Sequence, residues 1–359
     1  MKSDWQTPRV VEDFTYRGIE AMFLENRHLR ILLLPGKGGD ILEFRDKRVD
    51  VDVLYHAEHN WQMPADRSVP AVDATAFHDV YPGGWNVNLP VAGYTDDFGG
   101  TPYGLHGEAA LIPWEATVVR DDDEAVVVRL ETEFVRYPFS VERTLTLPAD
   151  ESSLHVEESV TNDGGVALEY MWQQHVALGR PLIDPAARLD VAEATGVVEP
   201  YGPDHENARL AADETFEWPF APGVDGDEVD LREFPPLDST IHDLAYATDL
   251  ADGWYAVTNP DLDLGFGFRF PTDPFECLWY WQPFGGNSTS PFFNRNYNVG
   301  LEPTTAYPGG DIPDAQRENG TMKTLDAGET VEAEFVATTY RGVDAVAGIG
   351  ADGSVEPAD

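Results

Sequence analysis

The sequence predicts an all-β fold, a large antiparallel β-sandwich with very little helix. Apolar and polar residues alternate with a period of two along much of the chain, short turn-forming segments separate these stretches, and helical periodicity is nearly absent. Strands that alternate in this way bury one face, and antiparallel strands joined by tight turns form sandwiches. The length of 359 residues allows one large domain or two smaller ones, and the shared pattern favours one.

The strongest strand signals come as two hairpins in the first half of the chain. Residues 139–147 alternate almost strictly, residues 148–150 form a turn, and residues 154–160 resume the alternation. A second hairpin is predicted from residues 116–120 and 125–134, which flank four consecutive acidic residues. The remaining predicted strands are residues 29–34, 40–44, 51–54, 254–258, 264–270 and 331–340.

Two segments depart from the strand pattern. Residues 198–240 are rich in Pro, Asp and Glu and lack a long alternating run, so we expect an irregular excursion that packs on the sandwich or covers a site. The acidic, glycine-rich residues 343–359 are predicted to be a disordered tail. The single sandwich domain is therefore expected to span residues 1–342.

The charge balance restricts the possible partners. The chain has 65 Asp and Glu against 23 Lys and Arg, a formal net charge of -42. Such a field repels nucleic acid and anionic membranes, so neither is expected as a partner. The 42% hydrophobic residues and nine Trp argue against disorder. A folded protein this acidic and poor in Lys suggests a halophilic origin with a salt-rich interior, because molar salt screens self-repulsion.

The chain carries no sign of secretion or membrane insertion. Its one cysteine, Cys277, allows no internal disulfide and fits a reducing compartment. Residues 1–5 run into charged positions without the apolar stretch of a signal peptide, and no apolar run approaches the ~20 residues of a membrane helix. We therefore expect a cytoplasmic protein.

Three ionisable residues stand in Gly, Pro or aromatic settings where a plain core would contain none. They are His106 in Gly104-Leu105-His106-Gly107-Glu108, His175 at the end of Tyr170-Met171-Trp172-Gln173-Gln174-His175, and Glu302 in Gly300-Leu301-Glu302-Pro303. Histidine titrates near neutral pH and a half-buried glutamate can be raised toward it, so this set suits proton transfer. Taken singly, each histidine is more often a structural residue, and Glu302 is an ordinary loop carboxylate.

The order of short motifs resembles the aldose 1-epimerase (galactose mutarotase-like) family, in a divergent branch. The resemblance covers residues 30–340. It rests on Gly83-Gly84 and Pro90 before His106-Gly107 and Trp114, on His175 before the Pro and Asp-rich residues 181–185, and on Glu302-Pro303 before Leu325-Asp326-Ala327-Gly328-Glu329. The arginine that the family places ahead of the first histidine has no match, since Trp85, Asn86 and Asn88 stand there instead.

The resemblance implies a mutarotase-like sandwich and a role for each of the three residues. His175 would be the acid toward the ring oxygen of an aldose, Glu302 the base toward the C1 hydroxyl, and His106 a further hydrogen-bond partner. The protein would then be an isomerase of carbohydrate metabolism that interconverts the anomers of a small sugar, and the reaction needs no metal or organic cofactor. The missing arginine weakens an assignment to sugar phosphates.

Candidates for substrate binding are aromatic or polar residues near these motifs. Trp281, Trp85 and Trp172 could stack on a sugar face, although aromatic side chains are more often core, and Trp281 is the best of them. Asn88 is a further candidate, and Asp243 could match the family's substrate-binding aspartate, with Asp249 and Asp252 equally plausible by position.

Two other motifs suggest sites that the sequence does not support. His56-Ala57-Glu58-His59 holds two imidazoles but offers no helix to align them and no third ligand, so no metal site is expected. The glycine-rich residues 284–288 lack the lysine and the following helix of a phosphate loop.

Three functions are compatible with these residues. The first is an aldose 1-epimerase-like enzyme, the second is a carbohydrate-binding protein without turnover, and the third is a domain related to polysaccharide hydrolases or lyases. An acid and base set favours the first over the second, because binding alone needs no proton transfer. The third predicts a fused catalytic domain, for which the sequence gives no sign. The identity of the sugar and the oligomeric state stay open.

Overall fold

The computed structural model describes residues 7–61, 76–95, 97–200, 205, 207–310 and 312–358. Within these residues the chain is built almost entirely of antiparallel strands, which confirms the predicted all-β sandwich. The α-helices of the described chain are two single turns, α1 (Ala76–Val80) and α2 (Asp314–Glu318). Residues 1–6, which include the segment examined for a secretory signal, lie outside the described residues.

The larger sheet has twelve strands and carries the site described below. In spatial order its strands are β1 (Arg9–Tyr16), β2 (Ile19–Glu25), β3 (Leu29–Leu34), β4 (Asp40–Asp46), β6 (Trp85–Asn88), β12 (Gln173–Leu178), β22 (Val299–Thr304), β21 (Cys277–Phe284), β18 (Ile241–Thr248), β14 (Thr195–Val198) and β15 (Thr215–Glu217), with β5 (Val51–Asp52) paired to β4.

The second sheet has eight strands and includes the two hairpins predicted from strict alternation. Its strands, in spatial order, are β13 (Arg188–Val191), β19 (Trp254–Asn259), β20 (Leu264–Arg269), β24 (Thr330–Tyr340), β10 (Ser153–Asn162), β9 (Phe139–Pro148), β8 (Ala125–Glu133) and β7 (Glu115–Asp121). The burial of β9 alternates residue by residue, as a strand with one wet face requires.

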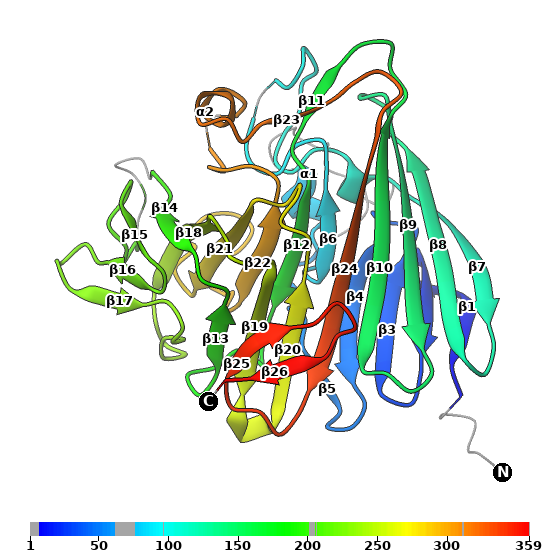
Figure 1. Cartoon of the computed structure of the whole chain (residues 1–359), viewed down its shortest axis with the longest axis horizontal. Helices are drawn as coiled ribbons and strands as arrows, with labels where there is room; N and C mark the ends of the chain where they lie inside the picture. The colour runs from blue at the N-terminus through cyan, green and yellow to red at the C-terminus, as the bar shows by residue number, and fades with distance from the viewer. Residues whose placement is uncertain are drawn as a thin grey trace.

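The two large sheets form the layers of the sandwich, one behind the other in Figure 1. Aromatic pairs join the layers: Phe44 of β4 meets Phe266 of β20 edge to face at 5.5 Å, and Trp85 of β6 meets Phe268 of β20 at 5.0 Å. These side chains are fully buried and belong to one apolar core. Short pairs of strands lie outside the two large sheets, namely β11 (Leu168–Tyr170) with β23 (Lys323–Leu325) and β16 (Phe220–Pro222) with β17 (Glu228–Asp230).

The C-terminal segment differs from its prediction. Residues 343–359 were expected to be disordered, but β25 (Val346–Ile349) and β26 (Val355–Pro357) form a hairpin that lies over β19 and β20 (Figure 1). Val346 and Ile349 are buried against Trp254 and Tyr340. These two apolar residues outweigh the acidic, glycine-rich composition, because burying each one gains about 1.5–3 kcal/mol.

The 198–240 segment is less irregular than its composition predicts. It contributes the end of β14, then β15, which extends the large sheet by pairing with β14. The hairpin of β16 and β17 follows. No helix in the described part of the chain has the length and apolarity that crossing a membrane requires.

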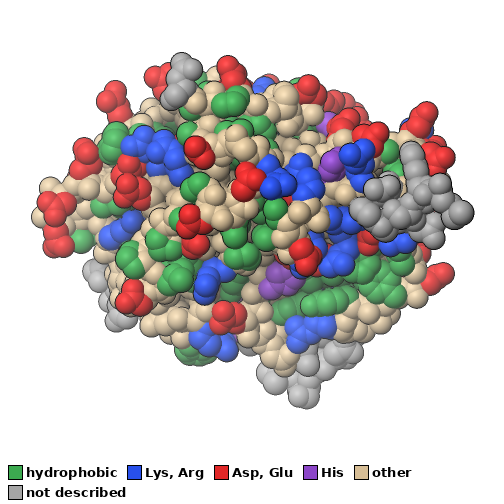
Figure 2. Space-filling view, turned by 90° about the horizontal axis from the view of Figure 1, so that it is seen from below, with side chains coloured by type: hydrophobic (Ala, Val, Ile, Leu, Met, Phe, Trp, Pro, Cys, Tyr) green, Lys and Arg blue, Asp and Glu red, His purple; other side chains and the backbone are tan. Residues whose placement is uncertain are grey.

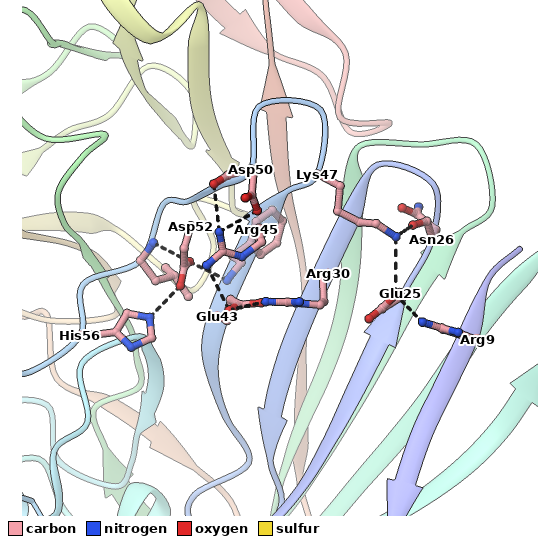
Figure 3. Close-up of polar contacts among 12 residues, drawn as sticks. Arg9, Glu25, Asn26, Arg30, Glu43, Arg45, Lys47, Asp50, Asp52 and His56 are labelled. Atoms are coloured by element: carbon pink, nitrogen blue, oxygen red, sulfur yellow. Dashed lines mark hydrogen bonds and ion pairs between the residues drawn. The ribbon is translucent and has the colours of Figure 1, made fainter. Parts of the chain in front are cut away.

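Charged side chains are mixed in sign on the face shown in Figure 2, where Lys and Arg lie among Asp and Glu. Strands β1–β5 show how such charges pair. Arg30 of β3 donates two hydrogen bonds to Glu43 of β4, and Arg45 reaches both Glu43 and Asp50 (Figure 3). Residues 1–50 contain nine basic and nine acidic residues, so the excess negative charge is carried by the rest of the chain.

Candidate active site

A cavity of about 360 Å³ lies on the outer face of the large sheet, at the middle strands β12, β22, β21 and β18. Residues of α1 and of the loops around residues 93–106 and 287–310 close it from above. Its lining is rich in titratable and aromatic side chains, and among the described residues it includes neither Lys nor Arg: Phe77, His78, Tyr81, Tyr94, His106, His175, Glu199, His205, His242, Trp279, Trp281, Phe292 and Glu302.

His175 and Glu302 are cross-strand neighbours in this cavity. Strands β12 and β22 pair with Gln173 opposite Thr304 and Val176 opposite Leu301, a register that sets His175 opposite Glu302. Directly opposite residues project from the same face of a sheet. His175 Nε2 and Glu302 Oε1 are 3.3 Å apart, and both side chains are almost fully buried.

A glycine creates the space for the Glu302 carboxyl group. Gly300 precedes Glu302 by two residues and therefore lies on the same face of β22. A Cβ atom at this position would lie 2.0 Å from Glu302 Oε1 and 3.3 Å from Trp281 Cε3. Glycine at residue 300 is thus required by the position of the carboxyl group.

His106 reaches the same cavity from a strained loop. Its backbone φ is 66°, in the left-handed region that a non-glycine residue adopts at a cost. The amide N–H of His106 donates to the carbonyl of Gly93, and its Nδ1 donates to the carbonyl of Ala92 at 3.0 Å. Because a carbonyl only accepts, Nδ1 carries the proton and Nε2 is left as an acceptor. The imidazole rings of His106 and His175 are 5.2 Å apart.

Burial keeps the imidazoles and the carboxyl group of this cluster uncharged at neutral pH. Loss of solvation lowers the pKa of His175 to about 3; a hydrogen bond to its own backbone opposes this shift, whereas Lys37 and His78 add to it. The same cause, joined by His175, lowers the pKa of His106 well below its usual value. Burial raises the pKa of Glu302 well above the ordinary range of a carboxyl group.

Trp281 forms a wall between the two ends of the cavity. Its ring lies 6.2 Å from that of His175, and its Nε1 donates to Nε2 of His242 at 3.2 Å. The ring of His242 is in turn 5.0 Å from that of His205, whose Nε2 contacts the carbonyl of His242 at 2.7 Å. Of the predicted aromatic candidates, Trp281 is the one that lines the cavity.

Sequence reasoning missed three histidines and one carboxyl group of the lining: His78, His205, His242 and Glu199. Burial, together with neighbouring histidines, lowers the pKa of His78 and of His242 to about 4. The Tyr246 hydroxyl donates to Glu199, and burial raises the pKa of that carboxyl group. His242 could have been identified from the alternation of β18, which places His242 and Asp243 on opposite faces of the strand.

Asp243, Trp85 and Asn88 were predicted to bind substrate, and the structure places none of them in the cavity lining. Asp243 is completely buried on the other face of β18, where it accepts from Arg209 at 3.0 Å. Trp85 is also completely buried, and its Nε1 donates to Gln174. Asn88 donates to Gln173. Each of these residues instead satisfies a partner within the sandwich.

Trp172 and the His56–His59 motif also lie away from the cavity lining. Trp172 is fully buried between Phe275 and Phe335. His56 pairs with Asp52 at 2.6 Å, as Figure 3 shows, whereas His59 contacts the carbonyl of His78. In the described residues, no three His, Cys, Asp or Glu side chains are arranged to hold a metal ion.

Solved structures similar to this chain include mutarotase-like proteins at low sequence identity. A proposed aldose 1-epimerase from Klebsiella pneumoniae matches with a TM-score of 0.68 and 17% identity, over 93% of this chain and 83% of that chain. A galactose mutarotase-like protein from Clostridium acetobutylicum matches with a TM-score of 0.66 and 15% identity, over 94% of this chain and 99% of that chain. A galactose mutarotase related enzyme from Lactobacillus acidophilus gives 0.60 and 14%, over 89% and 97%. These matches confirm the resemblance as one of fold.

No curated protein matches the sequence. A family profile described as a domain of unknown function, DUF4432, matches residues 16–338. This span covers most of the chain and contains His106, His175 and Glu302. The chain therefore belongs to the DUF4432 family.

Proposed function

We propose that this protein is an aldose 1-epimerase-like isomerase that interconverts the anomers of a free, uncharged monosaccharide. The observation that carries the proposal is the meeting of His106, His175 and Glu302, from three distant segments, in one cavity with Trp281 on its wall. A volume of about 360 Å³ is at the small end of ligand sites and suits a single sugar ring. The absence of Lys and Arg from the described lining supports an uncharged substrate.

The reaction needs one proton donor and one proton acceptor beside the anomeric carbon. The C1 hydroxyl loses a proton, the bond between C1 and the ring oxygen breaks, and the ring oxygen gains a proton. Rotation about the C1–C2 bond then presents the other face of the carbonyl group, and closure reverses the two transfers. No proton is gained or lost overall, so a pair of groups that holds one proton is sufficient.

His175 and Glu302 supply such a pair. In the ionised state, the imidazolium of His175 is the acid and the carboxylate of Glu302 is the base, as the family resemblance implies. Burial favours the uncharged state, in which the proton resides on Glu302. The distance of 3.3 Å between Nε2 and Oε1 allows the proton to be shared within the pair. Each positioned acid or base contributes roughly 10² to 10⁴ in rate.

The other lining residues would hold the sugar. The free Nε2 of His106 accepts a hydrogen bond from a hydroxyl group, because its Nδ1 already donates to Ala92. The indole of Trp281 offers an apolar face for the C–H side of a sugar ring. At the far end, His242 and Glu199 provide donors and acceptors for the remaining hydroxyl groups.

Exchange of the α and β anomers, followed by NMR or polarimetry over a panel of aldoses in high salt, tests the proposal. We expect faster exchange for at least one sugar, and His175→Ala and Glu302→Gln should each remove most of the acceleration. His155→Ala is a control, because His155 lies on β10 of the other sheet. Acceleration of no sugar, with binding detected by calorimetry, would favour a carbohydrate-binding protein instead.

A further inference from the structure

Four polar side chains lie in one row across adjacent strands of the large sheet. Asn86 of β6 is paired with His175 of β12, and the β12–β22 register sets His175 opposite Glu302. Ile41 of β4 is paired with Trp85, so the next position along sets Asp40 opposite Asn86. The row therefore runs Asp40, Asn86, His175, Glu302 on one face, with Cβ atoms of neighbours roughly 5 Å apart.

The row begins at an ion pair with no access to solvent. The side chains of Lys37 and Asp40 are both 0% exposed, and the ammonium group of Lys37 donates to Asp40 Oδ2. Lys37 Nζ also lies 6.0 Å from the ring centroid of Phe77, which in turn lies 6.0 Å from the ring of His175. Burying two charges is costly and often no more stabilising than an apolar core. A role other than stabilising the fold would explain why the Lys37–Asp40 ion pair lies behind the cavity.

Consecutive members of the row carry buried polar atoms without partners outside the row. Nδ1 of His175 has no hydrogen-bond partner among the described residues, and Asp40 Oδ1 and the side-chain amide of Asn86 have none apart from each other. Buried polar atoms are nearly always hydrogen-bonded, directly or through an ordered water. These four atoms lie at neighbouring positions and include both donors and acceptors, so a single set of hydrogen bonds among them accounts for all four.

We propose that Asp40 and Asn86 are positioning residues that hold the proton of neutral His175 on Nδ1 and leave Nε2 as the acceptor facing Glu302. The carboxylate of Asp40, fixed by Lys37, can only accept a hydrogen bond. The amide of Asn86 must then turn its NH₂ group toward Asp40 and its carbonyl toward His175, either directly or through one water. That carbonyl accepts only from a protonated Nδ1.

The charges around His175 are consistent with a neutral ring in a fixed tautomer. The groups that face it are Glu302 on β22, His106 on its loop, His78 and Tyr81 at α1, and the Lys37–Asp40 pair. Lys37 and His78 both oppose a positive charge on the ring. Burial raises the pKa of the Asp40 carboxyl group, and Lys37 and a hydrogen bond from Asn86 both oppose that shift.

Nitrogen-15 NMR of the histidine rings tests the proposal without any assay of activity. In the wild-type protein, Nδ1 of His175 should show the shift of a protonated nitrogen and Nε2 that of an unprotonated one, unchanged between pH 6 and 8. In Asn86→Leu the proton should redistribute toward Nε2. Asn88→Leu is the matched control, because Asn88 is equally buried on the same face of β6 but bonds to Gln173 and lies outside the cavity lining.

A proton on Nε2 in the wild-type protein would overturn the proposal, and this result needs no folded variant. An unchanged spectrum in Asn86→Leu, or an equal change in Asn88→Leu, would overturn it as well. If the proposed sugar isomerase activity holds, Asn86→Leu should lower kcat by about 10- to 100-fold, the usual effect of removing the partner that orients a functional histidine, with little change in KM. The NMR result stands whether or not that activity is found, so the two proposals fail separately.

Discussion

Replacing Gly300 with alanine should disable the site without unfolding the protein. The new Cβ would lie 2.0 Å from Glu302 Oε1 and 3.0 Å from its Cδ, both well inside van der Waals contact. Trp281 Cε3, at 3.3 Å, limits movement of the new methyl group on its other side. The carboxyl group of Glu302 has to give way, because the remaining neighbours are backbone atoms of paired strands and a packed indole ring.

The size of the effect follows from this geometry. Relief of a 2.0 Å contact requires the carboxyl group to move by roughly 1 Å or more before the atoms reach ordinary separation. Misplacement of a reacting group by about 1 Å costs on the order of 10²-fold in rate. Glycine within a strand is itself unfavourable by roughly 0.5–1 kcal/mol relative to alanine, so part of the strain on folding is offset.

The assay is anomer exchange by NMR, with thermal unfolding measured on the same samples. We expect kcat of Gly300→Ala to fall on the order of 10²-fold, whereas Gly348→Ala in β25, where a Cβ meets no atom closer than 3.4 Å, should leave it unchanged. A Gly300→Ala protein with wild-type kcat would refute the role given to the Glu302 carboxyl group.

Four further predictions concern the pH dependence of activity and of stability, the effect of salt, and the C-terminal hairpin. Since burial keeps one proton on the His175–Glu302 pair, kcat measured from pH 5.5 to 8 should be flat, and a bell-shaped profile centred in this range would contradict the neutral pair. Burial lowers the pKa of His242 to about 4, so below pH 6.5 the unfolded chain binds a proton that the native chain excludes. The free energy of unfolding therefore falls as the pH drops. In denaturant titrations between pH 4.5 and 6, the slope of this free energy against pH should be smaller in His242→Asn by about 1.4 kcal/mol per pH unit. With a net charge of -42, the melting temperature should fall by on the order of 10 °C when salt is reduced from about 2 M to 0.1 M, because the screening length grows from a few ångströms to about 10 Å. Deletion of residues 343–359 should cost about 3–6 kcal/mol in urea unfolding, since it removes the buried Val346 and Ile349.

The strands were predictable because alternation is a local property of the sequence. Predicted strands 29–34, 116–120, 139–147 and 331–340 correspond to β3, β7, β9 and β24 with ends that differ by at most one residue. The C-terminal hairpin was missed because its strands are short and gain their stability from contact with Trp254 and Tyr340, far away in sequence. Short strands depend on tertiary packing more than on their own pattern.

The site was only partly predictable. His106, His175, Glu302 and Trp281 were identified from the sequence, and they line one cavity. Asp243 was predicted to bind substrate, whereas its neighbour His242 is the one that lines the cavity, because a shift of one residue reverses the face of a strand. Lys37 and Asp40 were not predicted as part of the site, because nothing in the segment Gly36-Lys37-Gly38-Gly39-Asp40 indicates that both charges are buried.

The sequence by itself determined the all-β class, the positions of seven of the eight strands in the second sheet and the three ionisable residues that meet in the candidate site, because these depend on residue type and on a period of two. The tertiary structure alone decided which faces those residues share. Register across β4, β6, β12 and β22 sets Asp40, Asn86, His175 and Glu302 side by side. Burial in that row, rather than residue type, sets their protonation, because desolvation acts on a charge only where the fold has excluded water.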